Sequence, residues 1–366
     1  TIYNEYYRDQ NLETKRLVNV ASGNDTNYGN LEIQNRAWEK DYFTSALPWT
    51  QKGGEVSLPL TGNAEVIPSN TGDAAIIRDA TTLNTSGNRD IWSHTTDAEL
   101  TEASQTDSLM LDPNGSLEAD MTSVTAATIE ELRRASRLQE WLEKNARGGT
   151  RYIEQILAHF GVRSRDSRLQ RPEFLGGGKS PVVISEVLQT GETATTPQGT
   201  MAGHGISSGN SHSFKKTFEE HGILMGIVSV LPKTTYQQGL RKYFFKDDKF
   251  DYYWPEFAHL GEQEVKDKEL FFDGVDIETV FGYQSRYAEY KNIQSSVHGD
   301  FKDSLDFWHM GRIFSTQPSL NTDFVKSDPT HDIFAVTDPA VDKLYVQIYH
   351  NIKAIRPMPI FGTPKL

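Results

Sequence analysis

The spacing of apolar residues predicts two consecutive helices near the middle of the chain. In the first, apolar residues recur at helical intervals at Ile129, Leu132, Ala135, Leu138 and Leu142. Thr128 and Glu131 have the spacing of a capping box, and Gly148 is expected to end this helix. The second helix is predicted over residues 151–160, and a shorter one over residues 2–12.

Four other segments have the composition of β-strands. Residues 56–60 and 343–351 alternate apolar and polar side chains, which is typical of a strand with one buried face. Residues 181–188 are rich in valine and isoleucine. Residues 221–231 (HGILMGIVSVL) are apolar almost throughout, as expected of a strand that crosses a core. Between them, the Gly-, Thr- and Ser-rich residues 190–210 predict a loop.

These elements favour an antiparallel β-sandwich, because helices are few, the strands are separated by long loops, and strands and helices do not alternate regularly. The 366 residues suffice for one large domain or two smaller ones. The chain has no cysteine, so no disulfide can stabilise the fold. It also lacks an apolar run of about eighteen residues, so we expect no membrane insertion. Stability must therefore come from packing and from neighbouring subunits.

Acidic residues are concentrated in residues 61–123. This segment has eleven acids and two arginines, a net charge of −9 out of −13 for the whole chain. It is rich in Thr, Asn, Ser and Gly, so it can bury little apolar area by itself. We interpret it as a long surface loop or insertion. The net charge also argues against a surface that binds nucleic acid everywhere, although it permits a local patch.

Several segments contain reactive or metal-binding residue types, but none forms a recognisable motif. The loop at residues 169–178 leads into LGGGKS, which resembles a phosphate-binding loop. However, Glu173 stands where that pattern needs glycine, so the segment is interpreted as a turn. His204, His212 and His221 are not spaced as metal ligands.

A cluster of acids at Asp247, Asp248 and Asp251 lacks the spacing of an EF-hand. A solvated charge run is the simpler interpretation, with a Ca²⁺ site, its ligands unnamed, as the alternative. The nucleophile pattern G-x-S-x-G is absent as well. We therefore expect no enzymatic activity, no cofactor and no catalytic residue.

One basic and aromatic segment has the composition of a single-stranded DNA contact. Its basic residues are Arg241, Lys242, Lys246 and Lys249, and the aromatic residues among and after them include Tyr252 and Trp254. Basic groups can hold phosphates while aromatic rings stack on unpaired bases. The alternative is a core loop or subunit interface, with aromatic residues inside and charges outside. Lys353, Arg356 and Lys365 near the end of the chain form a second candidate patch.

Phrases scattered along the chain resemble a known family. They are NEYYRDQNL at 4–12, DYFTSALPW at 41–49, LQRPEFLGGG at 169–178, TYQQGL at 235–240, FAHLGEQ at 257–263 and RPMP at 356–359. Together they are similar to the major capsid proteins of the Microviridae, on the gokushovirus branch. The resemblance covers residues 1–60 and 125–366 and lapses between them. Resembling proteins carry a long stretch before the first phrase, so we expect this chain to lack early strands of the fold.

The resemblance implies an eight-stranded jelly roll with very long loops, with residues 1–60 and 124–366 as the shell domain. Residues 61–123 would form an outward protrusion that can meet a host receptor. Many copies would build a T=1 icosahedral capsid around circular single-stranded DNA. The implied partners are further copies of the chain, the packaged DNA, an internal scaffolding protein and a DNA pilot protein. The implied location is the virion, assembled in the host cytoplasm.

Two other classes of protein fit the composition. The many aromatic residues and long loops also suit a β-sandwich carbohydrate-binding module or a glycosidase, whose paired carboxylates the sequence cannot identify among 50 acids. A minor receptor-binding spike protein is the third interpretation.

Overall fold

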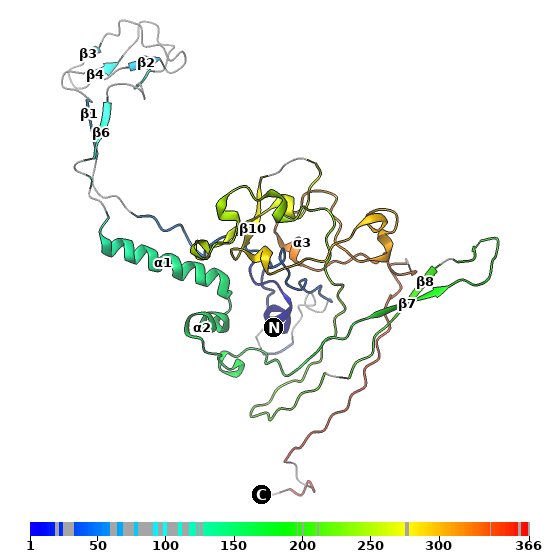
Figure 1. Ribbon diagram of the computed structural model, residues 1–366. Helices are drawn as coiled ribbons and strands as arrows, with labels where there is room; N and C mark the ends of the chain where they lie inside the picture. The colour runs from blue at the N-terminus through cyan, green and yellow to red at the C-terminus, as the bar shows by residue number, and fades with distance from the viewer. Residues whose placement is uncertain are drawn as a thin grey trace. The chain divides into compact units, whose positions relative to one another are not determined.

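The computed structural model describes residues 1–18, 22–24, 33–58, 64–68, 77–79, 91–93, 98–100, 109–111, 117–121, 124, 127–195, 197–199, 201–210, 212–274, 278–336, 338–357 and 360–364 (Figure 1). The chain divides into two compact units. One comprises Thr1–Thr50 and Asn145–Leu366, and the other Gln51–Lys144. The predicted insertion, residues 61–123, lies within the second unit.

The second unit contains three nested antiparallel strand pairs. β1 (Glu65–Pro68) pairs with β6 (Leu117–Asp120), β2 (Ile77–Asp79) with β5 (Leu109–Leu111), and β3 (Ile91–Ser93) with β4 (Ala98–Leu100). Each later pair lies, in sequence, between the two strands of the pair before it. Glu65 lies opposite Asp120, so the acidic segment begins and ends at one place.

The two predicted helices are confirmed. α1 spans Ile129–Gly148 and α2 spans Tyr152–Phe160. At the start of α1, the N–H of Thr128 donates to Glu131 Oε2 at 2.7 Å, and the N–H of Glu131 donates to Thr128 Oγ1 at 3.2 Å. This capping box also lowers the pKa of Glu131, because the hydrogen bonds from Thr128 favour its carboxylate. α2 ends at Gly161, whose φ of 69° is strained for most residues.

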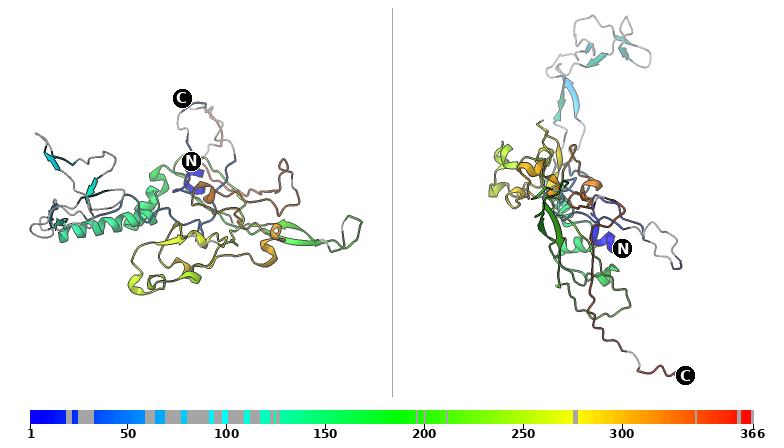
Figure 2. Two further views of the ribbon diagram at one scale, coloured as in Figure 1. Left: turned by 90° about the horizontal axis from the view of Figure 1, so that it is seen from above. Right: turned by 90° about the vertical axis from the view of Figure 1, so that its right-hand side faces the viewer.

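An antiparallel hairpin is formed by β7 (Val183–Leu188) and β8 (Met201–Ile206) (Figure 2). The strand predicted over 181–188 is therefore confirmed, but the loop predicted over 190–210 is wrong at β8. Its glycines hid the strand pattern. A Cβ on Gly203 would lie 3.2 Å from Ile184, and one on Gly205 would lie 3.0 Å from Val182 and 3.8 Å from Ile184, so side chains on and just before β7 cover both glycines.

The hairpin continues beyond its paired strands in the same register. The Glu173–Lys216 ion pair, at 2.6 Å, joins positions ten residues beyond the paired Val183 and Ile206. A Cβ on Gly176 would lie 3.0 Å from the carbonyl oxygen of Ser213, which keeps that register. The loop at residues 169–178 thus packs against the chain that follows β8.

Three strand predictions are wrong for the described residues. The described residues of 56–60, together with 221–231 and 343–351, are extended or irregular and have no paired strand. A strand needs a neighbouring backbone to satisfy its N–H and C=O groups, and no described segment supplies one. Ile223 is 90% exposed and Tyr345 is 99% exposed, so these apolar segments are also uncovered.

Short turns replace the helix predicted over residues 2–12. There, η1 (Tyr3–Tyr7) is a single π-helical turn, where η marks a short 3₁₀ or π helix. The remaining short helices are η4 (Asp166–Leu169), η5 (Lys242–Phe245), η6 (Lys249–Asp251), η7 (Pro255–Phe257), η8 (Asp267–Glu269), η9 (Ala288–Tyr290), η10 (Gly299–Lys302), η11 (Asp306–Trp308) and α3 (Thr322–Val325).

The core of the first unit lies around a small antiparallel sheet of β9 (Gln263–Lys266) and β10 (Val280–Gln284). Leu47 extends this sheet, because its N–H and C=O exchange hydrogen bonds of 2.9 and 2.8 Å with Tyr283. The buried cluster comprises Tyr42, Phe43, Ala46, Tyr236, Val265, Leu270, Phe281, Ala288, Phe324 and Val325. The described fold is thus low in helix with small antiparallel sheets, consistent with a mainly β protein.

Candidate functional site

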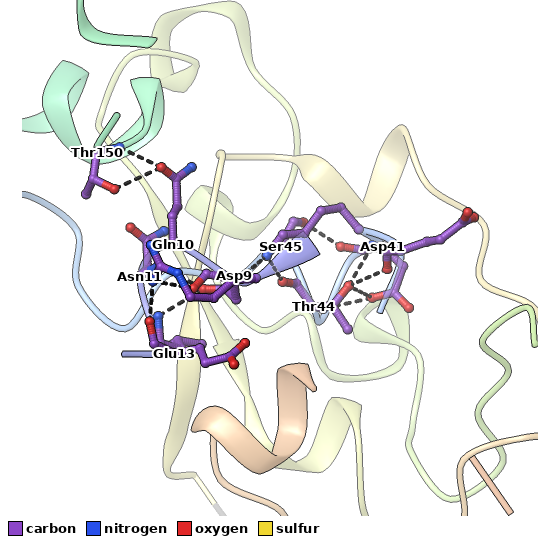
Figure 3. Close-up of polar contacts among 12 residues, drawn as sticks. Asp9, Gln10, Asn11, Glu13, Asp41, Thr44, Ser45 and Thr150 are labelled. Carbon is purple, nitrogen blue, oxygen red and sulfur yellow. Dashed lines mark hydrogen bonds and ion pairs between the residues drawn. The ribbon is translucent and has the colours of Figure 1, made fainter. Parts of the chain in front are cut away.

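Two of the phrases singled out in the sequence, at 41–49 and 235–240, meet at one polar and aromatic centre. Asp41 is its hub. Asp41 Oδ1 accepts the N–H groups of Phe43 and Thr44, at 3.0 and 2.8 Å (Figure 3). Asp41 Oδ2 accepts the hydroxyls of Thr234 and Tyr236, each at 2.7 Å. One carboxylate therefore holds the turn at 41–45 and ties it to the chain near 235. Burial and the charge of Asp41 raise the pKa of Tyr236, which stays a neutral donor.

Asp9 plays the same part in the first phrase. It is 3% exposed and accepts the N–H groups of Asn11 and Leu12, each at 2.9 Å (Figure 3). It also pairs with Lys40, immediately before the second phrase. Burial alone would raise the pKa of Asp9, but the charge and hydrogen bond of Lys40 and the two N–H groups outweigh it and lower the pKa.

Replacing Asp9 by asparagine is expected to lower the free energy of unfolding by roughly 1.5–3 kcal/mol at pH 7, because charged hydrogen bonds are lost. The folded pKa lies below the unfolded value of about 3.9. The stabilisation is therefore present above that value and is lost as pH falls through the folded pKa. Urea unfolding of wild type and Asp9→Asn at pH 7 and pH 3 measures this. A difference between the two proteins that does not shrink at pH 3 contradicts the assignment.

Aromatic rings surround the Asp41 hub. The Phe43 ring lies 4.9 Å from Tyr236 and 6.1 Å from Phe281, both at steep interplanar angles that favour edge-to-face contact. Arg312 closes the cluster on another side, because its guanidinium lies 4.0 Å from the centroid of Phe324 and donates to the carbonyl of that residue at 2.7 Å. Burial lowers the pKa of Arg312 despite opposing effects from Tyr236 and Asp41.

Two of the predicted DNA-contact lysines point into the protein. Lys242 Nζ lies 3.2 Å from Glu269 Oε1 and 2.5 Å from the carbonyl oxygen of Glu264, and its side chain is 11% exposed. Burial raises the pKa of Glu269, although Lys242, the N–H of Lys266 and the hydroxyl of Tyr42 all favour its carboxylate. An ammonium group held in this way is not presented to a phosphate.

Lys246 is held in the same manner. Its Nζ lies 2.9 Å from Glu289 Oε1 and 4.0 Å from the centroid of the Tyr290 ring, and its side chain is 5% exposed. Burial would lower its pKa, but hydrogen bonds to Tyr290 and Glu289 raise it, so Lys246 remains a cation. Glu269 and Glu289 could not be recognised as partners from the sequence, because each lies more than twenty residues from its lysine along the chain.

The other predicted contact residues are exposed. Arg241 and Lys249 both face solvent, and the side chains of Tyr252 and Trp254 are 50% and 55% exposed. Lys353 and Arg356 are exposed as well, in an extended segment far along the chain, and Lys365 lies outside the described residues. The structure thus keeps six of the eight described candidates accessible and does not gather them into one patch.

The remaining candidates have structural roles. Asp251 Oδ2 accepts the N–H groups of Asp247 and Asp248, so this acidic run caps η6. His212 lies 3.4 Å from the hydroxyl of Ser180, beside the extended hairpin. Among the residues that the structure describes, no three His, Asp or Glu side chains are grouped as a metal would require. Within the same residues, no helix is long and apolar enough to span a membrane.

The Asp41 centre joins distant parts of the chain through buried hydrogen bonds, and its described residues hold the fold together. The comparisons with known proteins identify the family. A model of the family described as capsid protein (F protein) matches residues 1–366. The chain belongs to this family, and it is a major capsid subunit of the Microviridae, of the gokushovirus type. Its location in the virion follows from that role.

Three curated relatives share this description. Capsid protein VP1 of Bdellovibrio phage phiMH2K is 39% identical over 377 residues, covering 99% of this chain and 70% of the relative. VP1 of Chlamydia phage 1 is 33% identical over 435 residues, covering 100% and 73%. VP1 of Spiroplasma virus 4 is 34% identical over 397 residues, covering 100% and 71%. The carbohydrate-binding, glycosidase and spike interpretations receive no support.

Proposed function

We propose that copies of this chain close an icosahedral T=1 shell around circular single-stranded DNA, built on an eight-stranded jelly roll. The family match over residues 1–366 carries this proposal. The uncovered apolar segments 221–231 and 343–351 support it, because such segments become stable strands only when other backbone pairs with them. In a closed shell, many modest contacts act together, so each interface need not be strong by itself.

Electron microscopy of the protein expressed with its helper proteins tests the shell. Closed particles of uniform diameter are expected, and they should protect single-stranded circular DNA from nuclease. A protein that remains monomeric with its helpers present contradicts the shell. Particles that form but do not protect DNA would support the proposed shell and contradict the proposal that it encloses DNA.

Of the described residues in the predicted set, only the exposed ones remain candidates for contacts to the DNA. Among them we prefer Lys353 and Arg356. These two residues belong to a segment, 343–357, in which three bases and His350 occur with no acid. Phosphate is attracted to such a segment. We further propose that an internal scaffolding protein and a DNA pilot protein are partners of this chain, and that it assembles in the host cytoplasm. No cofactor is assigned, and titration calorimetry with calcium chloride tests the alternative of a Ca²⁺ site.

We propose that the acidic residues 61–123 project outward and contact the host receptor. Their charge supports this location, because packaged DNA would repel them. Their ends also support a separable insertion, since Glu65 lies opposite Asp120.

Deleting residues 61–123 and joining the ends with a short glycine linker is expected to leave folding intact and to abolish attachment. A short linker is sufficient because Glu65 is paired with Asp120, so the two ends of the deleted segment lie close together. Circular dichroism and urea unfolding measure the fold, and adsorption of particles to host cells measures attachment. Global unfolding of the variant would show that the segment belongs to the core.

A further inference from the structure

Residues 241–254 form an exposed aromatic surface, here called the ledge, that two buried lysine side chains hold in place. The exposed rings are Tyr243, Phe244, Phe250, Tyr252, Tyr253 and Trp254, each between 39% and 66% exposed. Lys242 and Lys246 anchor the ledge, because their ammonium groups are bound to Glu269 and Glu289 in the interior. A ledge held in this way loses little side-chain entropy when a partner covers it.

The charges on the ledge favour a protein partner over DNA. Arg241 and Lys249 are exposed and form no ion pair with any residue that the structure describes. However, Asp247 and Asp248 are exposed between the same rings. Phosphate would be repelled by these carboxylates, whereas a protein surface of mixed charge can match both signs. Aromatic residues and arginine are also the residue types enriched at the centres of protein interfaces.

A second surface of the same unit carries an excess of acids. η10, η11 and the turn between them expose three acids and one base, at Asp300, Asp303, Asp306 and Lys302. Two rings accompany them, Phe301 at 47% and Phe307 at 46% exposure. Within the described residues these three carboxylates have no cationic partner.

The second surface is also held firmly. The amide of Gln237 donates to the carbonyl of Lys302 at 3.2 Å, and His309 Nε2 lies 2.7 Å from the carbonyl of Phe301. Figure 1 draws the ledge (yellow-green, η5 to η7) and the acidic surface (orange, η10 and η11) apart from one another. The two surfaces therefore do not cover one another within one subunit.

We propose that the ledge at residues 241–254 of one copy docks on the acidic surface at residues 299–308 of a neighbouring copy. The inference rests on the shell-forming role of the chain. Because two different surfaces meet, the contact is heterologous, and repetition of such a contact closes a ring when the rotation between neighbouring copies divides a full turn. The exposed rings supply buried area, while Arg241 and Lys249 against Asp303 and Asp306 set the orientation. Asp247 and Asp248 would face the exposed Lys302, a cation that DNA does not offer.

Charge reversal on each surface, and on both together, tests this contact. Arg241→Glu with Lys249→Glu and, separately, Asp303→Lys with Asp306→Lys are each expected to lower the yield of assembled particles at least about tenfold. The four-residue combination restores opposite charges and should recover most of that yield. Particles are quantified by sedimentation and electron microscopy. A matched control is Asp328→Lys with Asp332→Lys, which reverses two exposed acids elsewhere and should assemble normally.

The outcomes separate the alternatives. Unaltered assembly of either double variant, or failure of the combination to recover, overturns the contact, provided that urea unfolding shows each variant to be folded. If the Arg241/Lys249 variant forms shells at normal yield but protects no DNA, the ledge is a DNA contact and the proposal is wrong. If wild type itself forms no particles, the shell-forming function fails instead.

Discussion

Replacing Phe43 by alanine is expected to lower the free energy of unfolding by about 3–5 kcal/mol. Phe43 is 1% exposed and lies at the centre of the aromatic cluster, with ring contacts to Tyr42, Tyr236 and Phe281. Removing the ring loses its burial and leaves a cavity. The cavity collapses poorly, because hydrogen bonds to Asp41 hold both the backbone at residue 43 and the hydroxyl of Tyr236.

Urea unfolding of the isolated chain measures this effect. Phe43→Leu is the graded variant and should cost less than about 1.5 kcal/mol, since it keeps much of the volume. Phe218→Ala is the matched control, because that ring is 58% exposed and should change stability little. Equal losses for Phe43→Ala and Phe218→Ala would show that the cluster around Asp41 is not the core of the unit.

Elements that depend on local sequence were predictable. The capping box at Thr128 and Glu131 and the stop at Gly161 mark α1 and α2, because both signals act within one helical turn. β7 was predictable from its branched residues. Its partner β8 was not, since Gly203 and Gly205 are required by the side chains above them rather than by strand preference.

Elements that depend on a distant partner were not predictable. Residues 221–231 have the composition of a buried strand, yet they find no partner among the described residues. In the proposed shell a neighbouring copy would cover these residues, and a single subunit does not contain that partner. This supports the view that the capsid, rather than the subunit, completes the fold.

The candidate site also combines features that depend on local sequence with features that depend on distant partners. The sequence predicted Arg241, Lys242, Lys246 and Lys249 as candidate contacts to single-stranded DNA, with a core loop or subunit interface as the alternative. It could not separate exposed from anchored cations, because Glu269 and Glu289 reach the two buried lysines only through tertiary folding. Arg312, which packs over Phe324, was missed for the same reason.

Adding a single methyl group at Gly239 is expected to destabilise the subunit by about 1–3 kcal/mol or more. Gly239 lies in the TYQQGL phrase, and a Cβ there would stand 1.9 Å from the carbonyl oxygen of Glu269. That oxygen belongs to the backbone, so no side-chain rotation relieves the clash. Two hydrogen bonds of 2.9 Å fix the distance, from the N–H of Leu240 to Lys268 and from the N–H of Phe272 to Gln238.

Comparison with Gly226→Ala separates the steric clash at Gly239 from the effect of alanine on the unfolded chain. A Cβ at Gly226 meets no atom within 4 Å, and neither glycine has a positive φ. Both substitutions restrict the unfolded chain similarly, which by itself would stabilise a protein by about 0.4–1 kcal/mol. The difference between the two variants in urea unfolding therefore reports the contact between residues 239 and 269 alone. If Gly239→Ala is as stable as Gly226→Ala, the two backbones do not approach as closely as described. The glycine of TYQQGL would then need an explanation outside the isolated subunit.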